Sequence, residues 1–115
     1  MTHLVIINDP PYGTERAYNA LRLARSLLIA GEELRLFLMG DAVGCAIANQ
    51  RLVNGYYKLD RMIASVLSKG GDVGACGTCM EARGLTEEMF VAKARRSSLD
   101  ELTKWVQWAD KVITF

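Results

Sequence analysis

The chain alternates between short apolar runs and longer stretches in which apolar residues recur every three or four positions. The runs at residues 4–7 and 34–39 have the length of one strand and are mostly apolar. Such nearly continuous runs are typical of strands that are buried on both faces. In residues 17–28 and 59–67, the helical spacing places apolar side chains on one face and predicts two amphipathic helices. The pattern therefore predicts strands and helices in alternation.

The second half of the chain carries weaker signals of the same kind. Residues 72–75 are predicted as a third strand because they lie between a helix end and the short helical segment 76–83. Ser98 and Glu101 form the pattern of a capping box, in which each side chain bonds to the other residue's backbone N–H at a helix start. Residues 112–115 are predicted as a final strand. The apolar face expected for the capped helix consists of Leu99, Leu102, Val106 and Ala109.

Residues 86–97 are the ambiguous part of the chain. Local propensity predicts a helix over 87–96, whereas the alternation expected of a strand near 92–95 is poor. The alternation of strands and helices elsewhere indicates an α/β fold, in which helices cover both faces of a parallel sheet.

Length and composition indicate one ordinary globular domain over residues 1–115. Half of the residues are hydrophobic, 23% are charged and the net charge is +1. This near-neutral balance argues against a broad basic field, so no direct nucleic-acid partner is expected. No apolar run reaches the roughly 18 residues of a membrane helix, and the N-terminus lacks the pattern of a signal peptide. We therefore expect a cytoplasmic location without membrane contact.

Cysteine carries the candidate chemistry. Cys76 follows the predicted third strand, and reacting groups in an open parallel sheet collect at the carboxyl ends of the strands. The unpaired N–H groups and positive end of the following helix are expected to lower its pKa from the usual ~8.5. Gly77 and Thr78 leave the approach to this thiol open. Cys79 comes about one helical turn later, so the two sulfur atoms can meet.

Further polar residues are expected near the same edge of the sheet. Asp9 and Asp41 follow the first two predicted strands, and Tyr12 lies in the loop after the first. We predict that they line a rim for a substrate or partner. Arg83 comes about two turns after Cys76 and either holds an anionic sulfur species or pairs with a nearby glutamate.

The three cysteines predict neither a disulfide framework nor a zinc site. Their number is odd, and a C-x-x-C pair in a reducing compartment is more often catalytic or metal-binding. Zinc needs about four ligands, and beyond the C-x-x-C pair the chain offers Cys45, His3 and carboxylates. His3 precedes the first strand and is expected at the opposite end of the sheet, while Cys45 lies in an apolar segment that favours packing. We expect no metal within one chain and no cofactor.

The segment GACGTCMEARG, residues 74–84, resembles the DsrE/DsrF-like family and in particular its YchN-like members. In that family a cysteine precedes a short helix that ends in Arg-Gly, as Cys76 does here. The apolar first strand, the Gly-Asp-Ala-Val turn at 40–43 and the terminal segment 110–115 agree with the same family. The resemblance covers essentially the whole chain, and the segment from the cysteine to Arg-Gly is its most specific part.

The resemblance implies a fold, an assembly and a chemistry. The fold is a three-layer α/β/α sandwich with a five-stranded parallel sheet, which requires a fourth strand within 86–97 against local propensity. Family members assemble as trimers or hexamers, so a homo-oligomer is expected. Four aromatic residues are candidates for its interface or for the core: Trp105, Trp108, Tyr56 and Tyr57. Some members, such as the TusD-like proteins, belong to sulfur relays in which a cysteine carries sulfur as a persulfide from donor to acceptor proteins. By motif match that cysteine is Cys76, and Cys79 is an addition to the TusD-like pattern.

Three functions fit the sequence. The leading hypothesis is a persulfide carrier or sulfurtransferase-like protein in which Cys76 accepts sulfur and Cys79 assists; the sequence leaves open whether this is catalysis or carriage. The second is a dithiol/disulfide oxidoreductase, because C-x-x-C at a helix start is typical of thioredoxin-like proteins. The motif follows the third strand, however, and no proline follows Pro11 to serve as the cis-proline of that fold. The third is a non-catalytic oligomeric binding module with structural cysteines.

Overall fold

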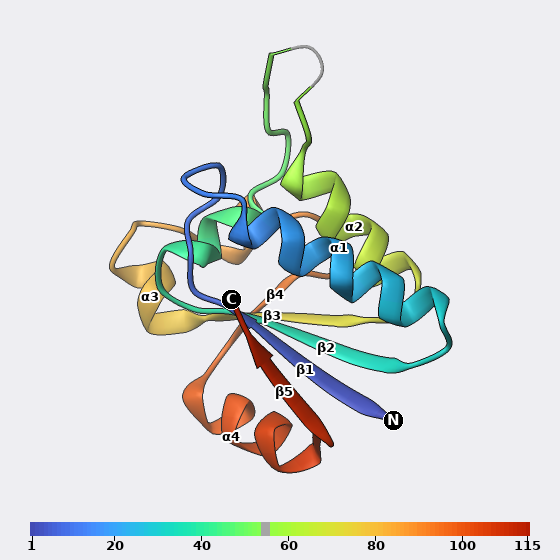
Figure 1. The fold of residues 1–115 in the computed structure, drawn as a ribbon. Helices are drawn as coiled ribbons and strands as arrows, with labels where there is room; N and C mark the ends of the chain where they lie inside the picture. Colours follow the sequence, from blue (N-terminus) through green and yellow to red (C-terminus); the bar gives the residue numbers. More distant parts are fainter. Residues whose placement is uncertain (54–55) are drawn as a thin grey trace.

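A five-stranded parallel sheet lies at the centre of the fold (Figure 1). The computed structural model describes residues 1–53 and 56–115. The strands run in the order β4-β3-β2-β1-β5, and every neighbouring pair is parallel. Their bounds are β1 (Thr2–Ile7), β2 (Glu33–Leu38), β3 (Asp72–Cys76), β4 (Arg95–Ser97) and β5 (Lys111–Thr114). The predicted parallel sheet is confirmed.

Helices cover both faces of the sheet (Figure 1). α1 (Arg16–Ile29) and α2 (Leu59–Ser68) lie side by side on one face, and α4 (Leu99–Trp108) lies on the other. The short α3 (Gly77–Glu81) lies beyond the carboxyl end of β3, beside the 3-10 helix η1 (Gly40–Ala46). A second 3-10 turn, η2 (Glu87–Met89), precedes β4. No helix within residues 1–53 and 56–115 is both long enough and apolar enough to cross a membrane.

The core has a larger layer on the side of α1 and α2 and a smaller one under α4. Val5 and Leu36 pair across β1 and β2, and both are fully buried. On the α4 side, the rings of Phe37 and Trp105 meet edge to face with centroids 6.0 Å apart. The residues of α1 that are buried follow the predicted helical spacing: Ala17, Ala20, Leu21 and Ala24. These two layers complete the three-layer sandwich that the family resemblance implies.

The helix predicted from propensity over 87–96 does not form, and a strand takes part of its place. Only η2 keeps one helical turn, and Lys93 has a positive φ of 77°, which a continuous helix does not allow. β4 then pairs with β3 and places Ser97 opposite Cys76. These long-range backbone bonds outweigh the local helix preference, which is only a weak determinant of structure. The family resemblance therefore predicted this strand, whereas local propensity did not.

The capping box at the start of α4 is half formed. The Ser98 hydroxyl accepts a hydrogen bond from the Glu101 N–H at 3.2 Å, as predicted. The Glu101 carboxylate bonds instead to Arg95 at 2.5 Å and to the Ser97 hydroxyl at 2.5 Å. Glu101 therefore connects α4 to the end of β4.

The apolar face predicted for α4 is wrong at two positions. Leu99 is 69% exposed and Val106 is 44% exposed, whereas Trp105 is buried. Trp105 lies over Gly74 in β3, where a Cβ atom would come within 3.2 Å of the indole ring. The missing side chain at Gly74 leaves room for the indole, so the helix turns Trp105 toward the sheet.

Candidate thiol site at the carboxyl end of the sheet

Cys76 is the last residue of β3 and the N-cap of α3. Its Sγ atom accepts a hydrogen bond from the Cys79 backbone N–H at 3.4 Å, which is the usual contact of a capping side chain. The Thr78 hydroxyl lies 3.3 Å from the same sulfur. The change from strand to helix therefore surrounds one sulfur with hydrogen-bond donors.

The Cys79 thiol completes this environment. Its Sγ atom lies 2.7 Å from Sγ of Cys76 and donates to it, and the Gly40 backbone N–H in turn donates to Cys79 at 3.3 Å. The predicted meeting of the two sulfurs is therefore present in the structure. It arises because three-residue spacing in the first turn of α3 places both side chains on the same side.

The pKa values of the two thiols are shifted in opposite directions. Burial opposes ionisation of Cys76, but the hydrogen bonds from the Cys79 and Thr78 side chains and backbone N–H groups outweigh it, so its pKa is lowered. Burial raises the pKa of Cys79, as does its own hydrogen bond to Cys76, although the Gly40 N–H and the charge of Arg83 act in the other direction. Cys76 is thus the more acidic thiol of the pair, and Cys79 is the less acidic one.

A pocket of about 380 Å³ opens beside the two thiols. Gly77, Thr78 and both cysteines form one wall, and Phe37 and Met39 contribute apolar surface. The rest of the lining comes from the end of β4 and the start of α4, with Arg96, Ser97, Ser98 and Leu99. The pocket gives a small molecule or a partner's side chain access to Cys76, which is itself only 9% exposed.

Arg96 is a pocket residue that the sequence pattern did not predict. Its guanidinium lies over Gly77, where a Cβ atom would come within 2.8 Å of it, and it forms an ion pair with Glu81 at 2.7 Å. Arg96 therefore places a positive charge beside the thiols. Propensity assigned it to a helix, and only the pairing of β4 with β3 moves it to the pocket. The basic character of residues 93–96 was the one available signal.

Arg83 and Asp41 do not line this pocket. Arg83 donates to Oδ1 of Asp41 at 2.6 and 2.9 Å and to the Cys79 carbonyl oxygen at 2.9 Å. Of the two predicted roles, the pairing role is the one that the geometry favours, with Asp41 in place of a glutamate. These contacts hold α3 against η1.

Asp9 and Tyr12 lie apart from the thiols. The Asp9 carboxylate accepts from the Thr14 hydroxyl at 2.7 Å, and the Tyr12 hydroxyl bonds to the Gln50 side chain and accepts from the Leu59 N–H at 3.0 Å. Neither residue lines the thiol pocket. They follow β1, which is two strands from β3, a separation of about 10 Å at ordinary strand spacing. The residues predicted to line one rim therefore lie in separate places. Of the predicted site residues, only Gly77, Thr78 and the two cysteines line the thiol pocket.

The third cysteine and the histidine are remote from this site. Cys45 is fully buried in the core, and burial raises its pKa to about 12. His3 is buried near the amino end of β1, 4.0 Å from Glu32 and at the opposite end of the sheet, as predicted. Within residues 1–53 and 56–115, no three His, Cys, Asp or Glu side chains gather as they do around a metal ion.

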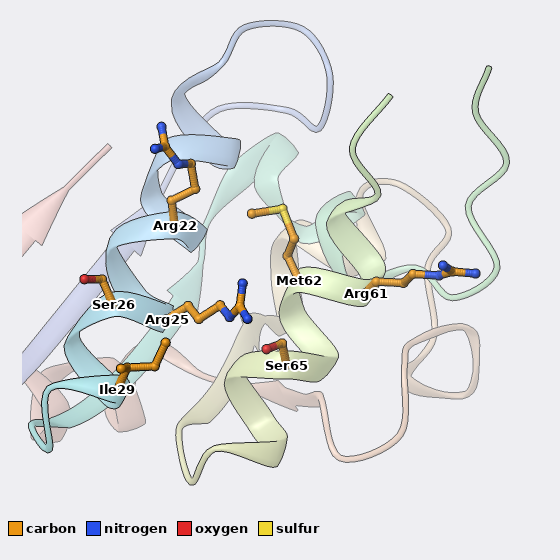
Figure 2. Close-up of a pocket in the computed structure, with 7 residues that line it drawn as sticks. All are labelled: Arg22, Arg25, Ser26, Ile29, Arg61, Met62 and Ser65. Carbon is orange, nitrogen blue, oxygen red and sulfur yellow. The ribbon is translucent and has the colours of Figure 1, made fainter. Parts of the chain in front are cut away.

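A second pocket, of about 480 Å³, lies between α1 and α2 (Figure 2). Three arginines line it, but Figure 2 shows that Arg22 and Arg61 extend away from the gap on opposite sides and only Arg25 reaches toward it. The remaining lining includes Met62 and Ser65 and no thiol or carboxylate. Its charges do not converge on one point, so the thiol pocket is the better candidate site.

Comparisons with known proteins extend over the whole chain. The family model that matches residues 1–115 is described as the DsrE/DsrF-like family. The uncharacterized protein MK0008 of Methanopyrus kandleri is 41% identical over 113 residues, which is 96% of this chain and 91% of that protein. The uncharacterized protein MJ0989 of Methanocaldococcus jannaschii is 38% identical and covers 100% of both chains. Protein YchN of Escherichia coli is 35% identical and covers 97% of both.

Solved structures show the same fold. The crystal structure of the YchN protein from E. coli superimposes with a TM-score of 0.92 at 36% identity and covers 100% of both chains. A protein of unknown function from Methanobacterium thermoautotrophicum, MTH1491, reaches a TM-score of 0.79 at 11% identity over 100% of both chains. The second likeness concerns the fold alone, whereas the first joins fold and sequence.

Proposed function

This chain belongs to the DsrE/DsrF-like family, and we propose that it carries sulfur as a persulfide on Cys76. The observation that carries the proposal is the Cys76 sulfur, which accepts hydrogen bonds from the Cys79 thiol and the Cys79 N–H and lies 3.3 Å from the Thr78 hydroxyl. These donors stabilise a thiolate, which is the nucleophilic form of cysteine. The adjoining pocket supplies a place for the donor group.

The transfer is an exchange between sulfur atoms. The Cys76 thiolate attacks the outer sulfur of a donor persulfide, R–S–SH, and a new S–S bond forms as the donor's S–S bond breaks. The products are the Cys76 persulfide and the donor thiolate, and the proton stays on the transferred sulfur. An acceptor thiolate then attacks the outer sulfur in the same way and restores Cys76. The exchange needs no cofactor, since electrons and atoms balance between thiols alone.

The Arg96 guanidinium supports the same proposal. The attacking and leaving thiolates are both anionic, and Arg96 lines the pocket that Cys76 also lines and lies over the adjacent Gly77. Its ion pair with Glu81 restrains the side chain. Arg96 is therefore suited to stabilise negative charge that moves between donor and carrier.

The second candidate function is dithiol/disulfide exchange. The 2.7 Å separation of the two sulfurs favours it, because a C-x-x-C pair in contact is close to disulfide geometry. The position of the motif after the third strand and the lack of a proline after Pro11 oppose a thioredoxin-like enzyme. Turnover in an insulin-reduction assay tests this function separately from sulfur loading.

The proposed carrier acts as a cytoplasmic homo-oligomer, a trimer or a hexamer. Apolar surface on the β5 side of the sheet supports self-association: Val112 is 43% exposed, and α4 leaves Ile6 only partly buried. The register of β1 and β5 pairs Val112 with Leu4, so both lie on the same face of the sheet. Sedimentation velocity measures the assembly. If the protein sediments as a monomer at micromolar concentration, this part of the proposal is wrong.

Intact-mass spectrometry tests the carrier role. The reduced protein, Cys76→Ser and Cys45→Ala are exposed to a cysteine-desulfurase donor under anaerobic conditions. We expect the wild type and Cys45→Ala to react with the donor, either keeping the added sulfur or passing it on. We expect no added sulfur on Cys76→Ser. Equal labelling of Cys76→Ser, or no reaction of the folded wild type, contradicts the proposal and favours the binding-module hypothesis.

A further inference from the structure

We propose that Cys79 discharges the Cys76 persulfide as free sulfide, so that the protein also reduces sulfane sulfur. The inference rests on the proposed function for the loading of Cys76. It adds an activity that a single carrier cysteine does not have. Without a second thiol, a persulfide waits for an external acceptor, whereas here the acceptor is built into the next turn of the chain.

The two sulfur atoms need to move only a short distance for this reaction. The two Sγ atoms are 2.7 Å apart, and a disulfide bond is about 2.05 Å long. Both thiols line the same pocket. The Gly40 N–H donates to the Cys79 sulfur at 3.3 Å, and Arg83 donates to the Cys79 carbonyl oxygen, so both the side chain and the backbone of Cys79 are restrained. Closure therefore needs no rearrangement of the sheet.

The reaction balances without another reagent. The Cys79 sulfur attacks the inner sulfur of the Cys76 persulfide, and the Cys76–Cys79 S–S bond forms as the bond to the outer sulfur breaks. The outer sulfur leaves as the hydrosulfide anion and takes up the proton that Cys79 gave up, which yields hydrogen sulfide. The two cysteine sulfurs are oxidised to a disulfide, and the sulfane sulfur is reduced to sulfide. An external dithiol then reduces the disulfide and restores the pair.

Loading itself prepares Cys79 for attack. In the unloaded protein, burial and the hydrogen bond that Cys79 donates to the Cys76 sulfur raise the pKa of Cys79. A persulfide on Cys76 turns that inner sulfur into a neutral atom with two covalent single bonds, so it no longer favours the proton on Cys79 as a thiolate does. The Gly40 N–H and the Arg83 charge, which favour a Cys79 thiolate, remain. Loading therefore removes one cause of the raised Cys79 pKa and favours attack by the second thiol on the persulfide.

The experiment supplies glutathione persulfide, which holds one sulfane sulfur per molecule, to the reduced protein under anaerobic conditions. Released sulfide and intact protein mass are measured for the wild type, Cys79→Ser, Cys79→Ala and Cys45→Ala. We expect the wild type and Cys45→Ala to release one sulfide per chain and to lose the mass of two hydrogens. We expect both Cys79 variants to gain one sulfur atom and to lose sulfide release.

The outcomes separate the two proposals. If neither the wild type nor the folded Cys79 variants gain sulfur or release sulfide, Cys76 does not load and the proposed carrier role fails. If the Cys79 variants load but the wild type also keeps its persulfide and releases no sulfide, the carrier role stands and the discharge by Cys79 is wrong. Equal sulfide release by the wild type and the Cys79 variants overturns the discharge as well. Circular dichroism of each variant establishes that it is folded.

Discussion

The Arg83 guanidinium lies 2.6 Å from Oδ1 of Asp41, and the same side chain donates to the Cys79 carbonyl oxygen at 2.9 Å. Asp41 directly follows Gly40, whose N–H bonds to the Cys79 sulfur. The ion pair therefore connects the turn after β2 to the helix that carries both thiols. It lies outside the pocket, and Arg83 restrains the backbone of Cys79.

We expect Asp41→Asn to slow formation of the Cys76–Cys79 disulfide while leaving the fold intact. An exposed ion pair contributes at most about 1 kcal/mol, so the expected slowing is no more than about fivefold. The rate is measured by mass spectrometry of alkylated samples after addition of oxidised glutathione. Asp9→Asn is the matched control, because it removes the same charge beside Thr14 and away from the thiols. Equal rates in the two variants contradict the positioning role of Asp41.

The pH dependence of Cys76 alkylation tests the hydrogen bonds around its sulfur. Because these bonds lower its pKa, the Cys76 thiolate forms at lower pH than it would without them, and iodoacetamide reacts with Cys76 at correspondingly lower pH. Thr78→Val removes one donor, and Cys79→Ala removes the thiol donor at 2.7 Å. Each change is expected to move the midpoint of the rate profile to higher pH, and Cys79→Ala should do so more strongly. A midpoint that stays unchanged in both variants contradicts this account of the site.

The buried Cys45 thiol predicts a loss of stability at alkaline pH. Its pKa is raised to about 12 in the folded protein and is near ~8.5 in the unfolded chain. Between these values the unfolded chain releases a proton that the folded protein keeps, so the free energy of unfolding falls by up to about 1.4 kcal/mol per pH unit. Urea unfolding from pH 8 to pH 10 (roughly the onset of this window) should show a shallower fall for Cys45→Ala than for the wild type. Equal slopes contradict the prediction.

Trp105 is expected to be the main stabilising residue of α4. It is buried against Phe37 and lies over Gly74, while the neighbouring Val106 is exposed. Trp105→Ala should lower the free energy of unfolding by about 3–5 kcal/mol, the usual cost of removing a large buried aromatic side chain. Val106→Ala is the control and should change it by about 0.5 kcal/mol or less. Chemical denaturation measures both, and a loss below about 1 kcal/mol for Trp105→Ala contradicts the packing seen here.

The central strands and the two long helices could be predicted because their signals are local. Residues 17–28 and 59–67 carry helical spacing that the structure retains in α1 and α2. The apolar runs of β1 and β2 have few polar positions, and a parallel sheet that is covered on both faces buries such runs. In these strands and helices, hydrophobic burial in the tertiary structure favours the same elements that the local pattern predicts, so pattern and fold agree.

The structure near β4 depended on contacts that the sequence pattern does not contain. Helix propensity over 87–96 was misleading because pairing of Ser97 with Cys76 and the positive φ of Lys93 belong to the tertiary arrangement. The same pairing moved Arg96 to the thiol pocket. Only the family resemblance predicted a strand in this region, because it carries information about tertiary structure that propensity lacks.

By itself, the sequence determined that Cys76 ends a strand and that Cys79 follows one helical turn later, because both relations depend on a few neighbouring residues. Tertiary structure alone decided which other groups reach those thiols. It brought the Gly40 N–H and Arg96 to the site, and it left Asp9 and Tyr12 two strands away. The physical reason is strand order: carboxyl ends that look equivalent along the chain become neighbours only when their strands are adjacent in the sheet.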